Sequence, residues 1–237
     1  MRTIFLFILT LAILSSCNFL GGKKVSGNGT IVSRDISAGS FENIEASGAI
    51  TVYLRQNATS SVKIETDENL MEFVEVVVDG NTLRIRPKKG YNLDPSKEVI
   101  VYAWAPGFRE VGISGASKLL SQGTLTGNNL QLDASGASEI QLDVDLPKID
   151  ANLSGASTLR LKGRAEDFST EASGASKILC MDLSAEKATL DLSGASNAKI
   201  TANKELVIDA SGASDVEYRG NADVDQKSSG ASSVKKV

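Results

Sequence analysis

Acidic side chains recur at one fixed place in this chain, two residues before a repeated tetrapeptide, Ser-Gly-Ala-Ser. These positions hold Asp133, Glu171, Asp191 and Asp209, with Asn152 at the same place in one copy. If the repeats stack as strands, neighbouring carboxylates would lie about 4.8 Å apart, close enough to share a divalent cation. The column is therefore a candidate ligand or cation ladder. A solvated acidic face is the competing interpretation, and the break at Asn152 favours it.

The composition removes most familiar catalytic and metal chemistry. The chain has no histidine, which excludes Ser-His-Asp and Cys-His nucleophile systems and histidine-ligated metals. Its two cysteines, Cys17 and Cys180, are too few for a common zinc site. A glycosidase or lyase would need carboxylates that converge beside a Lys or Arg, whereas these carboxylates form a column. We therefore predict no enzymatic activity, no catalytic residue, no metal centre and no cofactor.

The tetrapeptide repeat predicts a solenoid. Seven copies start 18 to 21 residues apart, and a degenerate copy begins at Ser47. A fixed period of this length is typical of units that stack along one axis. The seven copies begin at Ser114, Ser135, Ser154, Ser173, Ser193, Ser211 and Ser229.

Strict alternation between the tetrapeptides indicates strands rather than helices. From Leu130 to Leu142 every second residue is apolar or small, and most of the residues between them are polar. One coil of such strands per repeat gives an all-β, single-stranded parallel β-helix of about 19 residues per coil. Only 5% of the residues are aromatic, so the core must consist of thin layers of Val, Ile, Leu and Ala. Cys180 falls on the inner parity and is predicted to be a buried packing thiol.

Two arrangements of the corner stay open from sequence alone. If the alternation continues through the bend, the second serine of each tetrapeptide, such as Ser138 or Ser157, faces the core. If the bend reverses the alternation, the alanines face the core instead. In the first case the outward side is a strip of small residues that could dock a glycan or a second copy of the chain. The steric demands of a tight bend are the simpler explanation of that strip.

Residues 30–110 depart from the repeat and predict larger, insertion-bearing coils, followed by the tetrapeptide coils over 111–237. Strands are expected near 41–44 and 49–54 and at Val99–Ala105. The turn Asp79-Gly80-Asn81 between two apolar runs predicts a hairpin. Trp104 and Phe108 are interpreted as core or cap residues rather than as a sugar-stacking platform.

The first residues predict an export signal. A basic start and an apolar run from Ile4 to Leu14 indicate a signal peptide over 1–16. Leu14-Ser15-Ser16-Cys17 looks like a bacterial lipobox, in which the cysteine is acylated and becomes the new N-terminus. We therefore expect lipidation at Cys17, a tether over 17–29, and an outer membrane lipoprotein of the bacterial cell envelope. Whether it faces the periplasm or the cell surface stays open.

Several segments carry a family resemblance: Phe-Glu-Asn-Ile at 41–44, Ser-Gly-Ala-Ile-Thr-Val at 47–52, Asp-Gly-Asn-Thr-Leu-Arg-Ile at 79–85, and the tetrapeptide series after Ile113. Together they resemble a bacterial lipoprotein family, the putative auto-transporter adhesin, head GIN domain family, a domain of unknown function common in Bacteroidetes. The resemblance extends over roughly residues 28–237. It implies a right-handed parallel β-helix and an exported protein, and it supplies no catalytic residues.

These observations predict a non-catalytic envelope lipoprotein that acts as an adhesin or as a structural, surface-binding protein. The expected partners are the membrane, through the lipid, a glycan or other envelope polymer, and a second copy of the chain. The net charge is −4 and no Lys/Arg block is present, so nucleic acid is not an expected partner. Two alternatives remain: a carbohydrate-active β-helix enzyme of the lyase or hydrolase type, and a periplasm-facing envelope scaffold.

Overall fold

The computed structural model describes residues 22–237, so the predicted signal peptide and Cys17 lie outside the described residues. Strand β1 (Lys23–Ser26) pairs in parallel with β8 (Tyr91–Asp94). Four residues that sequence patterns assign to the tether therefore belong to the folded unit. The pairing is reinforced by an ion pair of 3.0 Å between Lys24 Nζ and Asp94 Oδ2. Among residues 22–237, no helix is long and apolar enough to span a bilayer.

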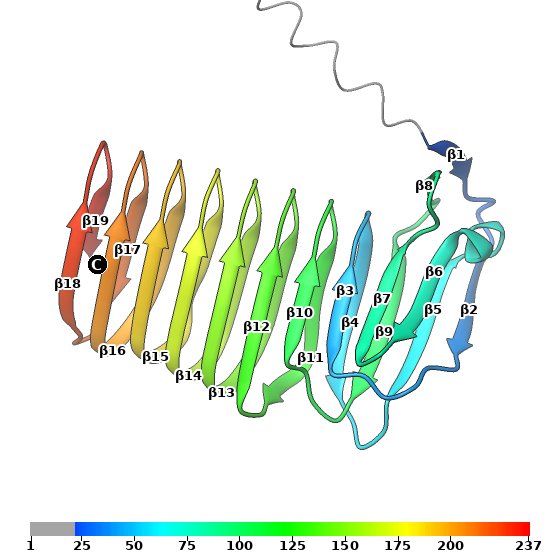
Figure 1. Cartoon of the computed structure of the whole chain (residues 1–237), viewed down its shortest axis with the longest axis horizontal. Helices are drawn as coiled ribbons and strands as arrows, with labels where there is room; N and C mark the ends of the chain where they lie inside the picture. The colour runs from blue at the N-terminus through cyan, green and yellow to red at the C-terminus, as the bar shows by residue number, and fades with distance from the viewer. Residues whose placement is uncertain (1–21) are drawn as a thin grey trace, which may run out of the picture.

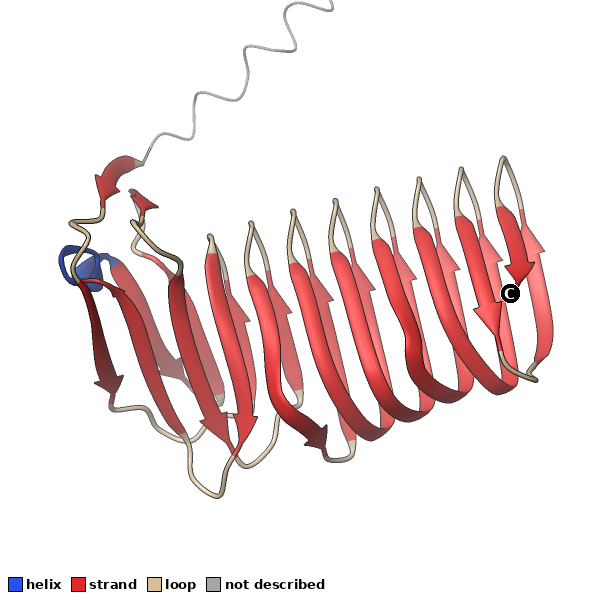
Figure 2. Ribbon diagram, turned by 180° about the vertical axis from the view of Figure 1, so that it is seen from behind, coloured by secondary structure: helices blue, strands red, loops and turns tan. Residues whose placement is uncertain are grey.

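A parallel β-solenoid of about seven turns, roughly 19 residues apart, forms most of the molecule, which confirms the predicted fold class (Figure 1). Each turn contains one strand that leads into a Ser-Gly-Ala-Ser corner and one strand that leaves it. Successive turns pair in parallel, so the first kind builds one sheet, here the inbound sheet, and the second kind builds the outbound sheet. The corner loops lie in a row along one edge (Figure 2).

The inbound sheet consists of β10 (Glu110–Ile113), β12 (Asn129–Ala134), the second halves of β13 to β16, and β18 (Asp223–Ser228). The outbound sheet consists of β11 (Lys118–Thr126), the first halves of β13 to β16, β17 (Asp215–Arg219) and β19 (Ser233–Lys236). The four long strands bend from one sheet into the other. They are β13 (Glu139–Leu153), β14 (Thr158–Ala172), β15 (Lys177–Leu192) and β16 (Asn197–Ala210).

The N-terminal strands extend both sheets in an order that differs from their order in the sequence. A turn made of β3 (Asn43–Ala46) and β4 (Ile50–Gln56) pairs with β10 and β11 on one side. On its other side it pairs with β7 (Thr82–Pro87) and β9 (Val99–Ala105). The larger coils expected over 30–110 therefore share one continuous core with the repeat, but they do not stack in chain order.

Antiparallel strands close this end of the solenoid. β6 (Val74–Asp79) pairs with β7 and confirms the predicted hairpin, while β5 (Ser61–Asp67) and β2 (Ile31–Ile36) extend the outbound sheet beyond β9. A short 3₁₀ helix, η2 (Glu68–Phe73), joins β5 to β6. A further coil would have to pair in parallel with the last strand of the stack. The antiparallel strands occupy that edge instead, so they act as a cap.

Asp67 fixes the cap to the segments around it. Its carboxylate is fully buried and accepts hydrogen bonds from Gly29 N (2.8 Å), Ser96 N (2.9 Å) and Ser96 Oγ (2.6 Å). Burial by itself would raise the pKa of Asp67, but the hydrogen bonds from Ser96 and Gly29 stabilise the charged form and leave the pKa below its ordinary value.

The sequence leaves open whether the serines or the alanines of each corner face the core, and the burial of the corner residues answers this. The second serine of each corner from Ser117 to Ser214 is at most 2% exposed, so these serines, and not the alanines, face the core. The strand parity is the same before and after the corner, but the glycine between, such as Gly136, is exposed. Each hydroxyl donates to the carbonyl oxygen three residues earlier, as Ser157 Oγ does to Ser154 O at 2.8 Å. These bonds lie within one corner, and they satisfy hydroxyls that would otherwise be buried without a partner.

Cys180 and Phe108 are buried, at 0% and 7% exposure, as predicted. The interpretation of Trp104 as a core or cap residue is wrong. In β9 the residues Val101, Ala103 and Ala105 point into the core, and Trp104 lies on the opposite parity, partly exposed on the outer face of the outbound sheet. Both parities of this strand consist of apolar or aromatic residues, so the alternation alone does not show which side is buried.

Candidate functional site

A groove of about 820 Å³ runs along the outer face of the inbound sheet, beside the row of corners. It crosses seven strands, from β7 through β3, β10 and β12 to β15. One wall is the column two residues before each corner, and the other wall is the first residue of the corner. We call it the axial groove. Its walls are formed by Arg84, Glu45, Gly112, Asp133, Asn152, Glu171 and Asp191, and by Arg86, Ser47, Ser114, Ser135, Ser154, Ser173 and Ser193.

The strand alternation creates the groove. Between the two outward walls stands an inward residue, such as Ala134 or Ala172, whose side chain is buried and whose backbone forms the floor. Gly112 pairs with both Glu45 and Asp133 and has no side chain, so it leaves a notch in the first wall. A Cβ added to Gly112 would lie 4.0 Å from its nearest neighbours, so the notch does not arise from close packing.

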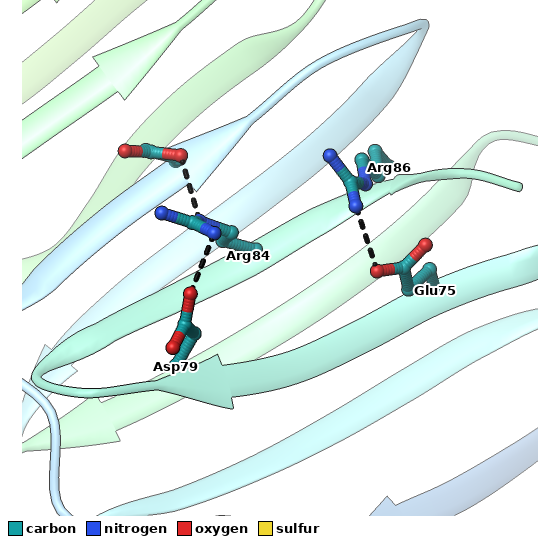
Figure 3. A network of polar contacts seen from close by, with 5 residues as sticks. Glu75, Asp79, Arg84 and Arg86 are labelled. Carbon is teal, nitrogen blue, oxygen red and sulfur yellow. Dashed lines mark hydrogen bonds and ion pairs between the residues drawn. The ribbon is translucent and has the colours of Figure 1, made fainter. Parts of the chain in front are cut away.

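Two arginines stand at the N-terminal end of the axial groove, and each is held by carboxylates (Figure 3). Arg84 donates from Nε to Glu45 Oε2 at 3.1 Å and from Nη1 to Asp79 Oδ2 at 2.7 Å. Arg86 Nη2 lies 2.9 Å from Glu75 Oε1, and the hydrogen bond from Arg86 lowers the pKa of Glu75. Each guanidinium group is therefore paired with at least one carboxylate, in ion pairs that are partly exposed to solvent.

Acidic side chains dominate the rest of the wall. Asp133, Asn152, Glu171, Asp191 and Asp209 pair in register on successive strands, so the predicted column exists. Asp209 continues the column just beyond the groove lining. Asn152, the one uncharged residue of the predicted column, donates from Nδ2 to Asp133 Oδ1 at 2.9 Å and so joins its strand to the neighbouring carboxylate. The carboxylates that follow in the column, Glu171, Asp191 and Asp209, form no ion pair with any residue of 22–237.

Nothing in this arrangement assembles a metal centre. Across residues 22–237, no three carboxylate or cysteine side chains come together as a metal site would require. The column remains a predicted ladder for a ligand or cation. The serine wall supplies hydrogen-bonding groups: the Ser135, Ser154 and Ser173 hydroxyls make no hydrogen bond within the described part of the chain. The axial groove thus offers one hydroxyl and one polar or charged group on most successive strands.

Sequence patterns identify the acidic column but not the groove it borders. The sequence does not identify Arg84, Arg86 and Gly112 as site residues. The two arginines belong to β7, which lies beside the repeat only through the out-of-order stacking. The parity of Thr82–Pro87, with Leu83 and Ile85 inward, is the signal that could have assigned both arginines to the outer face.

A family model described as the putative auto-transporter adhesin, head GIN domain matches residues 40–222. No curated protein matches the chain.

Several solved structures share its fold. A putative adhesin from Bacteroides fragilis has a TM-score of 0.83 at 18% identity, covering 90% of this chain and 100% of that one. A putative lipid binding protein from Parabacteroides distasonis has a TM-score of 0.77 at 20% identity, with 91% and 100% covered. A putative adhesin from Parabacteroides merdae has a TM-score of 0.70 at 23% identity, with 91% and 99% covered.

Proposed function

This chain belongs to the putative auto-transporter adhesin, head GIN domain family, and from that premise we propose that it is a non-catalytic binding protein of the cell envelope. Its ligand is an extended, linear glycan that carries no acidic groups and lies along the axial groove. The proposal rests on one observation: the groove is continuous over seven strands and repeats the same polar groups at the strand spacing. Repeated weak contacts along a rigid surface suit a polymer with a repeat of its own.

The charge of the groove selects the kind of polymer. Carboxylates at Asp133, Glu171 and Asp191 would repel a polyanion. They can accept hydrogen bonds from sugar hydroxyls or amino groups, and the serine hydroxyls can both donate and accept. The two arginines add little net positive charge, because three carboxylates, from Glu45, Asp79 and Glu75, pair with them. A neutral or amino-bearing glycan fits this combination best.

The arrangement disfavours the carbohydrate-active enzyme. Glycosidic cleavage by the common mechanisms needs an acid and a second carboxylate on opposite sides of one bond. Here the carboxylates follow one another along a single wall, and the opposite wall consists of serines and Arg86. A column of this kind can hold a chain at many places but does not concentrate acid and base at one of them.

A length series tests the proposal. Seven strands about 4.8 Å apart span roughly 30 Å. The affinity for neutral linear oligosaccharides, such as chito-oligosaccharides, should therefore rise with length and level off near that span. Titration calorimetry on the chain from residue 22 onward measures this. An affinity that does not depend on length would contradict the proposal, because it would indicate a small local site.

Attachment to the membrane is the second part of the proposal. Only five residues separate Cys17 from β1, so acylation of that cysteine would hold the capped end of the solenoid close to the bilayer. The change Cys17→Ala should move the protein from the membrane fraction to the soluble fraction. Protease treatment of intact and lysed cells then separates the two locations: digestion on intact cells supports an adhesin, and protection until lysis supports a periplasm-facing scaffold.

A further inference from the structure

Three aromatic side chains form a row on the outer face of the outbound sheet, across the molecule from the axial groove. Tyr53 lies on β4, and Tyr102 and Trp104 lie on the neighbouring strand β9. The ring centroids of Tyr53 and Tyr102 are 5.4 Å apart with planes at 16°, and those of Tyr102 and Trp104 are 5.8 Å apart at 19°. All three side chains are partly exposed.

The row is not part of the core. Its neighbours in the strands, Val52, Leu54, Val101 and Ala103, are fully buried, which fixes the aromatic side chains on the outside. The chain contains one tryptophan and four tyrosines, and it places the tryptophan and two of the tyrosines here. Tyr and Trp at an exposed position join an apolar ring to a hydrogen-bonding group, which is why they are concentrated in binding surfaces.

The spacing of the rings leaves part of each face open. Rings in full contact lie about 3.5 Å apart, so centroids 5.4 and 5.8 Å apart belong to rings that are offset and overlap only in part. The row is therefore a stepped apolar surface about three rings long. The flat C–H face of a pyranose ring has the shape and polarity to pack on such a surface.

Two cations flank the row, and neither forms an ion pair among residues 22–237, although Lys63 pairs in register with Asp35 on β2. Arg55 pairs in register with Trp104, and Lys63 with Tyr102. Thirteen ion pairs join charged groups among residues 22–237, and neither Arg55 nor Lys63 takes part in one. Glu65 lies nearby, close enough to add to the effect of burial in raising the pKa of Tyr102, and it can accept hydrogen bonds from hydroxyl groups. Arg55 faces no carboxylate in the strand register, so it is the stronger of the two cations as a complement to an anion attached to a ring.

We propose that Tyr53, Tyr102 and Trp104, with Arg55 and Lys63, form a second binding site whose ligand is an acidic saccharide. The aromatic rings pack on the sugar rings, and the two cations, on opposite sides of β9, bind carboxylates of the saccharide. The site is independent of the axial groove, because it lies on the other sheet and selects the opposite charge.

Trp104 provides the readout, because it is the only tryptophan in the chain and lies inside the site. Titration with trigalacturonate at low salt should shift or quench its fluorescence with saturation. Neutral galactotriose should bind at least tenfold more weakly, a difference of about 1.4 kcal/mol. Raising the salt should weaken the binding of trigalacturonate, because the two cations carry the selectivity.

Variants assign the signal to named residues. Tyr102→Ala, Arg55→Gln and Lys63→Gln should each weaken the binding of trigalacturonate several-fold. The controls Leu179→Ala and Arg164→Gln, also on the outbound sheet, should leave it unchanged, as should any change in the axial groove. Far-UV dichroism verifies that each variant is folded. The proposal is overturned if trigalacturonate gives no saturable change at millimolar concentration, if galactotriose binds equally well, or if the controls weaken binding as much as the site variants.

Discussion

Gly136 stacks so closely on Gly115 that a Cβ atom on Gly136 would lie 2.6 Å from the Gly115 carbonyl oxygen. The same carbonyl accepts a hydrogen bond of 2.7 Å from Ala137 N, so the corners are joined from coil to coil as the strands are. Gly136 also has a φ of +77°, a conformation that residues with a Cβ adopt only at a cost. The glycine of the repeat thus meets two independent demands, one from its own backbone and one from the coil below.

Replacing this glycine should destabilise the fold. Gly136→Ala would combine the cost of positive φ with a clash against backbone, so we expect the free energy of unfolding to fall by about 1–3 kcal/mol. Urea denaturation measures the change. Gly39→Ala is the matched control, because a Cβ there meets no atom within 4 Å. Equal midpoints for the two variants would contradict this explanation of the repeat.

The two serines of one corner should respond differently to alanine. Ser157 is fully buried and donates to Ser154 O, so Ser157→Ala removes a buried hydrogen bond and should cost about 1 kcal/mol. Ser154 is exposed, and its side chain makes no hydrogen bond within residues 22–237, so Ser154→Ala should change stability by less than about 0.5 kcal/mol. Denaturation of the two variants side by side tests this, and a larger loss for Ser154→Ala would show that the assignment of inner and outer serines is wrong.

The repeat coils could be predicted because each of their features is local. Alternation within one coil, such as Leu130 to Leu142, identifies the strands, and the spacing of successive tetrapeptides identifies the coils. The order of the N-terminal strands depends on pairing between distant segments. Nothing in Asn43–Ala46 shows that it lies between Thr82–Pro87 and Glu110–Ile113, since all three have an inward apolar pair of similar size.

Acid should loosen the cap through Asp67. Because its pKa in the folded state is below the ordinary value of 3.8, the unfolded state takes up the proton first as the pH falls. The stabilisation is fully present above about pH 5 and is lost as the pH falls through 3.8 towards the folded pKa. Denaturation midpoints at a series of pH values should show this decline. Asp67→Asn should be less stable at neutral pH and should show a smaller decline between pH 5 and 3, and an unchanged decline would exclude Asp67 as its source.

The thiol of Cys180 should be inert in the folded protein. Burial raises the pKa of Cys180 to about 12, so the reactive thiolate is almost absent at neutral pH, and reagents cannot reach a side chain with 0% exposure. In a Cys17→Ser chain, Ellman's reagent should react with Cys180 only at the rate of unfolding, and urea should accelerate the reaction. Rapid labelling without denaturant would contradict the buried position.

The candidate site was only half predictable for a related reason. The acidic wall repeats at a fixed place before each corner and is visible in the sequence at Asp133 or Asp191. The arginine end of the groove comes from β7, and its position depends on the out-of-order stacking. Sequence alone places Trp104 on the wrong side of its strand, because Ile100 and Trp104 on the outer parity are as apolar as Val101 and Ala103 on the inner one.

The axial groove as the site of glycan binding is tested most directly by filling its notch. Gly112→Tyr would place a ring between Glu45 and Asp133, where a Cβ is tolerated, while Thr189→Tyr places the same ring on the inbound sheet outside the groove. The measurement is the Kd for the longest neutral oligosaccharide that the unaltered protein binds, with stability checked for both variants. We predict that Gly112→Tyr weakens binding at least tenfold, about 1.4 kcal/mol, and that Thr189→Tyr has no effect. Equal binding by both folded variants would contradict the account.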